Sequence, residues 1–510
     1  MAAGSTEAGA TAEAVANGPL PAPPAILGLI GMVNPRFPSL YQINTRVWLN
    51  GGTLDDAPDA ELDHIAARGF EWVWLLGVWQ TGEKGREAAL AEPPLMDDYR
   101  RALPDFTERD VCGSCFSVAG YTVARSLGGD AALARIRERL QKRGLRLMVD
   151  LVPNHTALDH PWVRDHPEFY VHGTEADLAR DPRNYYRTGS AVLAHGRDPY
   201  FPGWQDTLQL NYAEPAMQEA MISEMLRIAG QADGVRCDMA MLILPDVFEK
   251  TWGLRPPPFW PHAIDRVRAQ HPQFTFLAEV YWDREWDLQQ QGFDYTYDKR
   301  LYDRLRDGHA PPVREHFLAD AAFQRKSARF LENHDEPRAA AIFPPAMHRT
   351  AAVLAFLCPG LRFFHQGQLE GRRVRLPVQL CREPAEPLDQ DLAGFYDRLL
   401  ACLRDDVLRD GEWELVEPVP AWNGNGTSDS FLGFAWSGPG GRRMLIAVNY
   451  SASQGQCYLR PPFPDLRGKQ VRFEDRLGPD AYDRDGDEVL GRGLYLDLPA
   501  WGCHVFDVRL

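Results

Sequence analysis

Strand-like and helix-like patterns alternate from Tyr41 to Arg404, which predicts an α/β protein built on a (β/α)8 barrel, the TIM-barrel fold. About sixty residues rich in His, Pro, Tyr, Asp and Gly follow the third strand, a length typical of a domain inserted in a barrel loop. After about residue 410 the helical period disappears, and short strands separated by turn residues predict a C-terminal antiparallel β-sandwich domain.

The chain of 510 residues is long enough for more than one structural unit. We expect a disordered tail over residues 1–24, because Ala, Gly, Ser, Thr, Glu and Pro dominate it. The barrel is expected over residues 25–410, with the inserted subdomain at 156–213 and the C-terminal β-domain at 411–510.

The first part of the barrel is expected to hold three strands and two helices. The strands are predicted at 41–49, 72–76 and 145–151, and the helices at 59–68 and 131–143. A glycine follows each helix and favours its termination. Between the second strand and the second helix, a long irregular stretch is predicted from about residue 80 to residue 129.

The second part continues the alternation to a count close to eight units, which favours a closed parallel sheet with right-handed crossovers. Strands are predicted at 234–237, 274–278, 293–296, 328–331 and 361–364, and helices at 215–229, 261–270, 283–291, 299–305, 349–356 and 390–404. In the C-terminal domain we expect strands at 431–436, 443–449, 457–459 and 502–508.

Charge and composition restrict the possible partners. The formal net charge is −16 and the sequence has no basic run, so neither nucleic acid nor an anionic membrane is expected as a partner. A small neutral carbohydrate or a glucan is compatible with this balance. The 14 Trp, 17 Tyr and 24 Phe suit stacking on sugar faces, although they suit a large core equally well.

The eight cysteines are scattered along the chain, and only Cys112 and Cys115 form a close pair. A single C-x-x-C without a second Cys or His pair nearby is weak evidence for zinc or redox chemistry, so a structural role is favoured. Scattered cysteines are typical of reduced thiols, and residues 1–24 lack the features of a secretion signal. The apolar stretch 26–33 is too short to span a bilayer. We therefore expect a cytoplasmic protein.

Polar residues recur where the predicted barrel strands end, and in a (β/α)8 barrel these positions share one open face. They are Asp150, Asn154 and His155, then Arg236 and Asp238, then Glu279, and finally Asn333, His334 and Asp335. Each segment alone has another interpretation: Arg236 and Asp238 could form a surface ion pair, Glu279 could be a solvated acid, and Asp335 could cap a helix. Four such segments in order at strand ends predict an active site.

These segments resemble the four short signature regions of the α-amylase family of glycoside hydrolases and transglycosidases. The resembling segments are Asp150-Leu-Val-Pro-Asn-His155, Gly234-Val-Arg-Cys-Asp238, Glu279-Val and Asn333-His-Asp335. Tyr121 in Gly-Tyr-Thr is similar to an aromatic platform of the family, and Asp206-Thr-Leu-Gln-Leu-Asn211 resembles an extra signature that closes the inserted domain. The resemblance extends from Tyr41 into the C-terminal domain.

The resemblance implies that Asp238 is the nucleophile, Glu279 the general acid/base and Asp335 a third acid that stabilises the distorted sugar. A glycosidic bond breaks through an oxocarbenium-like transition state, so one carboxyl must donate a proton while an ionised carboxylate attacks the anomeric carbon. This double displacement retains the anomeric configuration and needs the two carboxyls about 5 to 5.5 Å apart. Glu279 then needs a raised pKa, which burial and neighbouring acids would supply.

The resemblance also implies substrate-binding roles. His155 and His334 would hydrogen-bond hydroxyls of the transferred sugar, and Tyr121 would stack on the sugar face. Arg236 would keep Asp238 ionised and oriented, and Asp150 would anchor Arg236.

We expect no catalytic metal and no cofactor. In many calcium-dependent members of the family a histidine follows the nucleophile by four positions, whereas here that residue is Leu242. Asn154 alone does not make a calcium site, because calcium takes six or more oxygen ligands. The histidines between His160 and His195 have loose spacing and are expected to lie in a polar, substrate-facing loop.

The signature residues imply a retaining α-glycoside hydrolase acting on oligosaccharides or α-glucans, but two other activities stay open. The stretch Asp159–Phe169 resembles inserts of maltosyltransferases that use maltose 1-phosphate, so an α-glucan transglycosidase is an alternative, and a trehalose-synthase-like isomerase is another. A non-catalytic barrel that binds a membrane transporter is a remote possibility, because this chain has the full acid set and no membrane anchor is expected. Trp282, Tyr185 and Tyr186 are candidates for acceptor contacts.

Overall fold

The computed structural model describes residues 35–189 and 191–510. The disordered tail expected at residues 1–24 lies outside the described residues.

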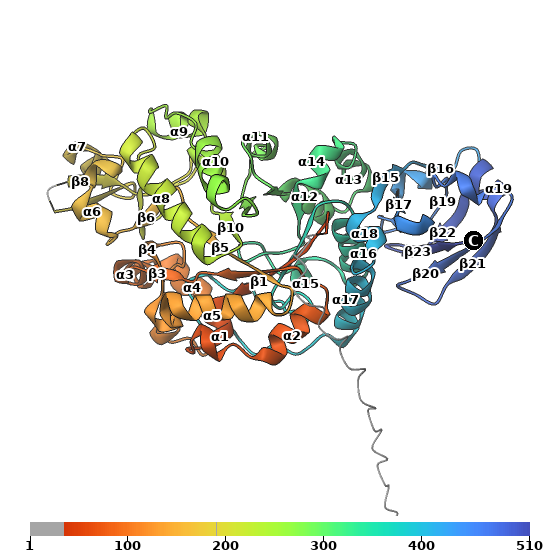
Figure 1. Cartoon of the computed structure of the whole chain (residues 1–510), viewed down its shortest axis with the longest axis horizontal. Helices are drawn as coiled ribbons and strands as arrows, with labels where there is room; N and C mark the ends of the chain where they lie inside the picture. The colour runs from red at the N-terminus through yellow and green to blue at the C-terminus, as the bar shows by residue number, and fades with distance from the viewer. Residues whose placement is uncertain (1–34, 190) are drawn as a thin grey trace, which may run out of the picture. The chain divides into compact units, whose positions relative to one another are not determined.

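Eight parallel strands close into a barrel, which confirms the fold class (Figure 1). The strands, in chain order, are β1 (Ser39–Asn44), β2 (Trp72–Leu76), β5 (Arg146–Leu151), β10 (Gly234–Cys237), β11 (Thr275–Ala278), β12 (Tyr295–Tyr297), β13 (Ser327–Arg329) and β14 (Leu361–His365). They neighbour one another in this order around the barrel, and β14 pairs with β1 to close it. All five residues of β2 are buried, as expected for a parallel strand covered on both faces.

Helices follow the strands and bury one face each. The long ones are α2 (Asp59–Ala67), α5 (Gly129–Gln141), α8 (Pro215–Gln231), α10 (Trp260–Gln270), α12 (Lys299–Asp307), α16 (Pro345–Phe356) and α17 (Gln390–Leu403). In α5 the buried positions Ala132, Leu133, Ile136 and Leu140 recur at helical spacing. Shorter helices are α9 (Pro245–Trp252), α11 (Glu285–Gln290), α13 (Ala310–His316), α14 (Ala321–Arg325), α15 (Ala339–Ile342) and α18 (Asp406–Asp410).

Two predicted elements near the N-terminal end of the barrel are wrong in part. The strand predicted at 41–49 ends at Asn44, where the asparagine side chain accepts a hydrogen bond from the Val47 N–H and begins helix α1 (Thr45–Leu49). The stretch predicted as irregular contains helices α3 (Glu83–Ala91) and α4 (Pro93–Ala102), and an antiparallel pair of strands, β3 (Trp79–Thr81) and β4 (Val118–Val123).

A segment between β5 and α8 forms its own small sheets (Figure 1). Strand β6 (His155–Ala157) pairs with β9 (Thr207–Gln209), and β7 (Tyr185–Thr188) pairs with β8 (Ala191–Ala194). Short helices α6 (Pro161–Asp165) and α7 (Glu175–Arg180) lie between them in the chain.

The C-terminal residues form two antiparallel sheets with a separate apolar core. The six-stranded sheet has the order β15, β17, β18, β23, β20, β21, and the three-stranded sheet has the order β16, β19, β22. Their bounds are β15 (Glu412–Val416), β16 (Pro418–Pro420), β17 (Phe431–Ser437), β18 (Arg443–Asn449), β19 (Gly455–Leu459), β20 (Gln470–Asp475), β21 (Ala481–Asp485), β22 (Leu494–Leu498) and β23 (Cys503–Arg509), with helix α19 (Gly486–Gly491) after β21. Trp436 donates to the Leu357 carbonyl at 2.9 Å and Tyr450 to the Leu305 carbonyl at 2.6 Å, so this domain is bonded to the barrel helices.

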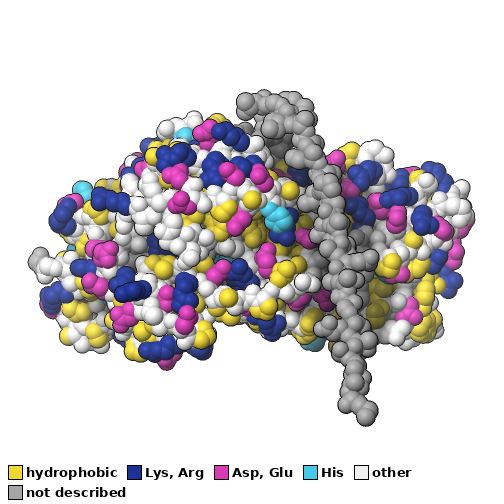
Figure 2. Space-filling view, turned by 90° about the horizontal axis from the view of Figure 1, so that it is seen from below, with side chains coloured by type: hydrophobic (Ala, Val, Ile, Leu, Met, Phe, Trp, Pro, Cys, Tyr) yellow, Lys and Arg dark blue, Asp and Glu magenta, His cyan; other side chains and the backbone are white. Residues whose placement is uncertain are grey.

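On the face shown in Figure 2, basic and acidic side chains are interspersed. Over the part of the chain that the structure describes, no helix has both the length and the apolar composition needed to cross a membrane.

Candidate active site

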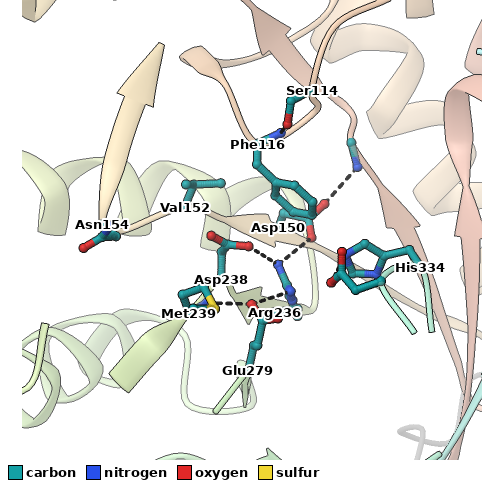
Figure 3. A network of polar contacts seen from close by, with 12 residues as sticks. Ser114, Phe116, Asp150, Val152, Asn154, Arg236, Asp238, Met239, Glu279 and His334 are labelled. Atoms are coloured by element: carbon teal, nitrogen blue, oxygen red, sulfur yellow. Dashed lines mark hydrogen bonds and ion pairs between the residues drawn. The ribbon is translucent and has the colours of Figure 1, made fainter. Parts of the chain in front are cut away.

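The predicted site residues meet at the carboxyl ends of the barrel strands (Figure 3). Arg236 on β10 lies opposite Asp150 on β5 in the strand register. Asp238 and Glu279 come directly after β10 and β11, and the segment carrying His334 follows β13. Segments far apart in the sequence are thus brought to one end of the barrel.

Arg236 is the centre of this group. Its Nη1 lies 2.7 Å from Asp238 Oδ1, and its Nη2 lies 2.6 Å from Glu279 Oε2. Burial disfavours the guanidinium charge, but Glu279 and the other acids outweigh it and raise the pKa of Arg236 well above its usual value. A permanent cation therefore joins the two carboxyls that the resemblance assigns as nucleophile and acid/base.

Glu279 is buried and held by three donors. Besides Arg236, the Met239 N–H donates to Oε2 at 2.7 Å and the Tyr281 hydroxyl donates to Oε1 at 2.9 Å. Burial nevertheless raises the pKa of Glu279 to about 8, with a further contribution from the negative charge of Asp238. Met239 adopts φ 42°, a left-handed conformation that is costly for a residue other than glycine. This backbone turn aims the N–H at the carboxylate.

Asp150 supports Arg236 from behind. Its two oxygens accept hydrogen bonds from the Trp74 indole at 3.1 Å and the Gly77 N–H at 2.9 Å, and Oδ1 lies 4.0 Å from Arg236 Nη1. Burial raises the pKa of Asp150 to about 7, while Arg236 opposes this shift.

His334 and Asp335 lie at the open end of the group. Gln42 Nε2 donates to His334 Nδ1 at 2.8 Å, so the ring proton lies on Nε2, which is 3.1 Å from Asp335 Oδ2. Burial lowers the pKa of His334 well below its usual value and keeps the ring neutral. The Asp335 side chain is 45 % exposed, so its carboxylate is open to a ligand.

His155 is buried at the start of β6, where its ring packs 5.2 Å from the Trp204 ring. Burial lowers its pKa, whereas Asp238 and the Phe116 carbonyl act in the opposite direction. The structure thus places His155 near Asp238, with burial favouring the neutral ring.

Tyr121 does not lie against Arg236. It is 4 % exposed, and its hydroxyl donates to the Val152 carbonyl and accepts from the Val152 N–H, both at 3.0 Å. One of the aromatic rings that pack against the guanidinium belongs to Phe116, whose centroid lies 5.2 Å from the Arg236 central carbon and 5.4 Å from the His334 ring (Figure 3). Stacking of Tyr121 on a sugar stays a prediction, and Phe116 is a second candidate for that role.

Several buried polar atoms of the described residues lack a hydrogen-bond partner at this end of the barrel. They are Gln42 Oε1, Arg236 Nε and His365 Nδ1. Buried polar groups are costly unless they find partners, and the hydroxyls of a sugar could supply them.

Sequence reasoning missed five of these residues. Gln42 and His365 stand at the carboxyl ends of β1 and β14 and could have been found by the same argument as Asp150. Phe116, Tyr281 and Tyr297 show no signal of their own, because only the folded chain brings their rings to the acids.

The side chain of Asn154 is occupied within the protein. Its Oδ1 accepts a hydrogen bond from Gln209 Nε2 at 3.0 Å, and Leu242 is buried as part of the core. Among the described residues, the one group of acids and His close enough to share an ion is Asp475, Asp480 and His504, in the C-terminal domain. The expectation of no catalytic metal stays a prediction.

Comparison with known proteins identifies the family. The model of the α-amylase catalytic domain matches residues 114–297, which include Asp150, Asp238 and Glu279. Alpha-amylase MalA from Haloarcula japonica is 26 % identical over 408 residues, covering 78 % of this chain and 53 % of that protein. The family model and this relative both support the α-amylase family. The predicted family is therefore confirmed.

Other α-amylase relatives are of two kinds. An alpha-1,4-glucan:maltose-1-phosphate maltosyltransferase from Salinibacter ruber is 30 % identical over 147 residues, 26 % of this chain and 20 % of that protein. The crystal structure of a maltogenic alpha-amylase from Thermotoga neapolitana superposes with a TM-score of 0.69 at 19 % identity, covering 93 % of this chain and 99 % of that one, which shows the shared fold. The chain spans about half the length of the first curated relatives it matches.

Replacing Tyr281 with Phe should move the alkaline limb of the pH profile. The hydroxyl stabilises ionised Glu279, so its loss raises the pKa of Glu279. Glu279 then stays protonated to higher pH. A hydrogen bond to a charged group is worth about 1.5 to 3 kcal/mol, so the limb of kcat/KM should rise by about one pH unit.

Tyr450→Phe is the matched control, because it removes a hydroxyl that donates to the Leu305 carbonyl and should leave the limb in place. If the alkaline limb of kcat/KM in Tyr281→Phe stays at the same pH or moves to lower pH, Tyr281 does not stabilise ionised Glu279.

Proposed function

We propose that the protein is a retaining α-glycoside hydrolase that cleaves α-glucosidic bonds of oligosaccharides or α-glucans by double displacement. The observation that carries the proposal is the single guanidinium of Arg236 in contact with both Asp238 and Glu279. Two carboxyls held on one guanidinium suit the short spacing, about 5 to 5.5 Å, that a retaining mechanism needs.

In the first step, Glu279 donates its proton to the leaving glycosidic oxygen while Asp238 attacks the anomeric carbon. The raised pKa of Glu279, about 8, leaves it protonated at neutral pH, as a general acid requires. The ion pair with Arg236, at 2.7 Å, holds the Asp238 carboxyl in place beside the reacting carbon, as a nucleophile requires.

In the second step, the same glutamate acts as a base. Once Asp238 is esterified it no longer carries a negative charge, and one of the contributions that raise the pKa of Glu279 is removed. Arg236, the Met239 N–H and the Tyr281 hydroxyl then stabilise the Glu279 carboxylate while it accepts a proton from the attacking water.

In this proposal the substrate binds at the open end of the group, where His334 and Asp335 lie. The exposed carboxylate of Asp335 and the neutral ring of His334 can accept and donate hydrogen bonds to sugar hydroxyls. The partly exposed ring of Phe116, which lies 5.2 Å from the Arg236 central carbon, supplies apolar surface beside the reacting sugar.

A transglycosidase is the second candidate, and an exposed aromatic group favours it. Tyr200, Phe201, Trp282 and Trp286 are exposed, and the rings of Tyr200 and Trp282 meet edge-on at 5.1 Å. Trp282 has φ 64°, a strained turn just after the segment that carries Glu279. A sugar acceptor bound on these rings would compete with water for the glycosyl-enzyme.

The maltosyltransferase relatives agree with this second candidate. A trehalose-synthase-like isomerase requires the same acids and is distinguished by its products. A non-catalytic barrel protein is disfavoured, because Asp238, Glu279 and Asp335 are all present. A cytoplasmic location remains part of the proposal, supported by the eight free cysteines.

Proton NMR of the protein with maltotetraose, maltose, trehalose and sucrose tests the proposal. Release of the α-anomer without longer products is expected for a retaining hydrolase. Elongated oligosaccharides would establish a transglycosidase, and exchange between trehalose and maltose an isomerase. Release of the β-anomer, or no reaction even after phosphorylated donors are added, would contradict the proposal.

Asp238→Asn and Glu279→Gln should each lower kcat by roughly a thousandfold or more while the protein stays folded, because both groups act in the transition state. Initial rates on the substrate found by NMR, with circular dichroism to check folding, measure this. Asp483→Asn, in an exposed ion pair of the C-terminal domain, is the control and should keep full activity. Near-normal activity in Asp238→Asn would overturn the assignment of the nucleophile.

Treatment with a chelator should leave the rate within about twofold of the untreated protein, because Asn154 Oδ1 is bonded to Gln209 and the side chain of Leu242 offers no ligand atom. Activity is measured after dialysis against EDTA, with and without added calcium. Loss of activity that calcium restores and magnesium does not would show that the prediction is wrong.

A further inference from the structure

Two cysteines that are distant in the sequence lie on one face of a short antiparallel contact. Val111 and Leu380 form an isolated β-bridge, flanked by hydrogen bonds from the Cys112 N–H to Gln379 at 2.8 Å and from the Cys381 N–H to Asp110 at 2.9 Å. Residues opposite or two apart on paired strands point to the same side. Cys112 and Cys381 are therefore diagonal neighbours across the bridge.

The surroundings of the two thiols differ. A hydrogen bond from Cys381 and the nearby guanidinium of Arg46, whose Nη1 lies 3.5 Å from Cys112 Sγ, lower the pKa of Cys112 to about 6. The contact with Cys112 raises the pKa of Cys381. At neutral pH the pair is thus a thiolate beside a thiol. Both side chains are half-buried, so small reagents can reach them.

Cys115, the sequence partner of Cys112 in the C-x-x-C motif, is not equivalent. It is buried, and burial raises the pKa of its thiol well above the usual value. A zinc site is also disfavoured, because the cationic Arg46 lies against the thiolate and would repel a metal ion. The pair considered below is therefore Cys112 and Cys381, which the fold brings together.

We propose that Cys112 and Cys381 form a thiol-modification site, in which Cys112 reacts with low-molecular-weight disulfides and Cys381 closes an intramolecular disulfide. The Cys112 thiolate attacks one sulfur of the small disulfide, forms a mixed disulfide and releases one small thiolate. Cys381 then attacks the Cys112 sulfur. The second small thiolate leaves and takes up the proton that Cys381 loses. Two protein thiols lose two electrons, and one small disulfide becomes two thiols.

One of the two segments that the bond would join contributes to the active site. Cys112 precedes Phe116, which lies over Arg236. Cys381 belongs to the segment that follows β14 in the chain. The proposal itself depends on thiol chemistry and not on the glycosidase activity.

The test uses the reduced full-length protein, oxidised glutathione at pH 7 and peptide mapping by mass spectrometry. The protein should lose two thiols and yield one cross-linked peptide pair containing Cys112 and Cys381. Cys381→Ser should accumulate one glutathione on Cys112, because the resolving thiol is gone, and Cys112→Ser should form neither product. Cys503→Ser is the matched control and should behave like the unsubstituted protein, since Cys503 is half-buried with its pKa raised to about 12 by burial.

The pH dependence of alkylation by iodoacetamide provides a second readout that does not need the disulfide to form. In Cys381→Ala, which removes the hydrogen-bond donor, the Cys112 midpoint should lie above that of the unsubstituted protein, which is expected near pH 6. Absence of the cross-link, a glutathione adduct that persists on Cys112 in the unsubstituted protein, or a Cys112 midpoint near the ordinary value of about 8.5 would each overturn the proposal.

Discussion

The structure of the site depends on the burial of one cation, the guanidinium of Arg236. A charge without solvent is costly unless acids and aromatic faces surround it, and removing one partner of such a group leaves an uncompensated charge. Here Asp150, Asp238 and Glu279 supply the anions, and the rings of Trp74 and Phe116 cover the planar faces. Strand register fixes this arrangement, because a shift of one residue would turn Arg236 away from the site.

The number of protons in this buried group follows from its charges. Three carboxylates around one guanidinium would leave two negative charges in excess, and the group avoids this by holding protons. Burial raises the pKa of Glu279 to about 8 and that of Asp150 to about 7, so near neutral pH the cluster carries less negative charge than three ionised carboxylates would. The same burial keeps a proton on Glu279, the acid that shares Arg236 with Asp238.

Much of this could be predicted from the sequence because a parallel barrel converts order along the chain into position around a ring. Asp150, Asp238, Glu279 and Asp335 were found as strand-end residues without any knowledge of packing. The barrel strands could be predicted for a second reason, because buried parallel strands appear in the sequence as apolar runs. The exception is Thr45–Leu49, where alternation suggested a strand but an Asn44 cap began a helix.

What escaped prediction depends on contacts between distant segments. Phe116 lies in a stretch without clear periodicity, and nothing in its neighbours indicates that it covers Arg236. Tyr121 carried the more obvious aromatic signal, yet its hydroxyl is bonded to the backbone at the end of β5. Cys112 has a partner three positions away in the motif, whereas the fold gives it another partner beyond β14.

A side-chain amide contributes to the attachment of the inserted segment to the site. Gln209 on β9 faces His155 on β6 in the strand register, and its Nε2 lies 2.9 Å from the Asn154 carbonyl, 3.0 Å from Asn154 Oδ1 and 3.1 Å from the Leu210 carbonyl. The NH2 group of Gln209, with three oxygens around it, links the end of β5 to the inserted segment by hydrogen bonds. A small cation bound to the same oxygens could make a similar link. The position of His155 at the catalytic end therefore follows from Gln209, because the amide fixes the turn from which β6 begins.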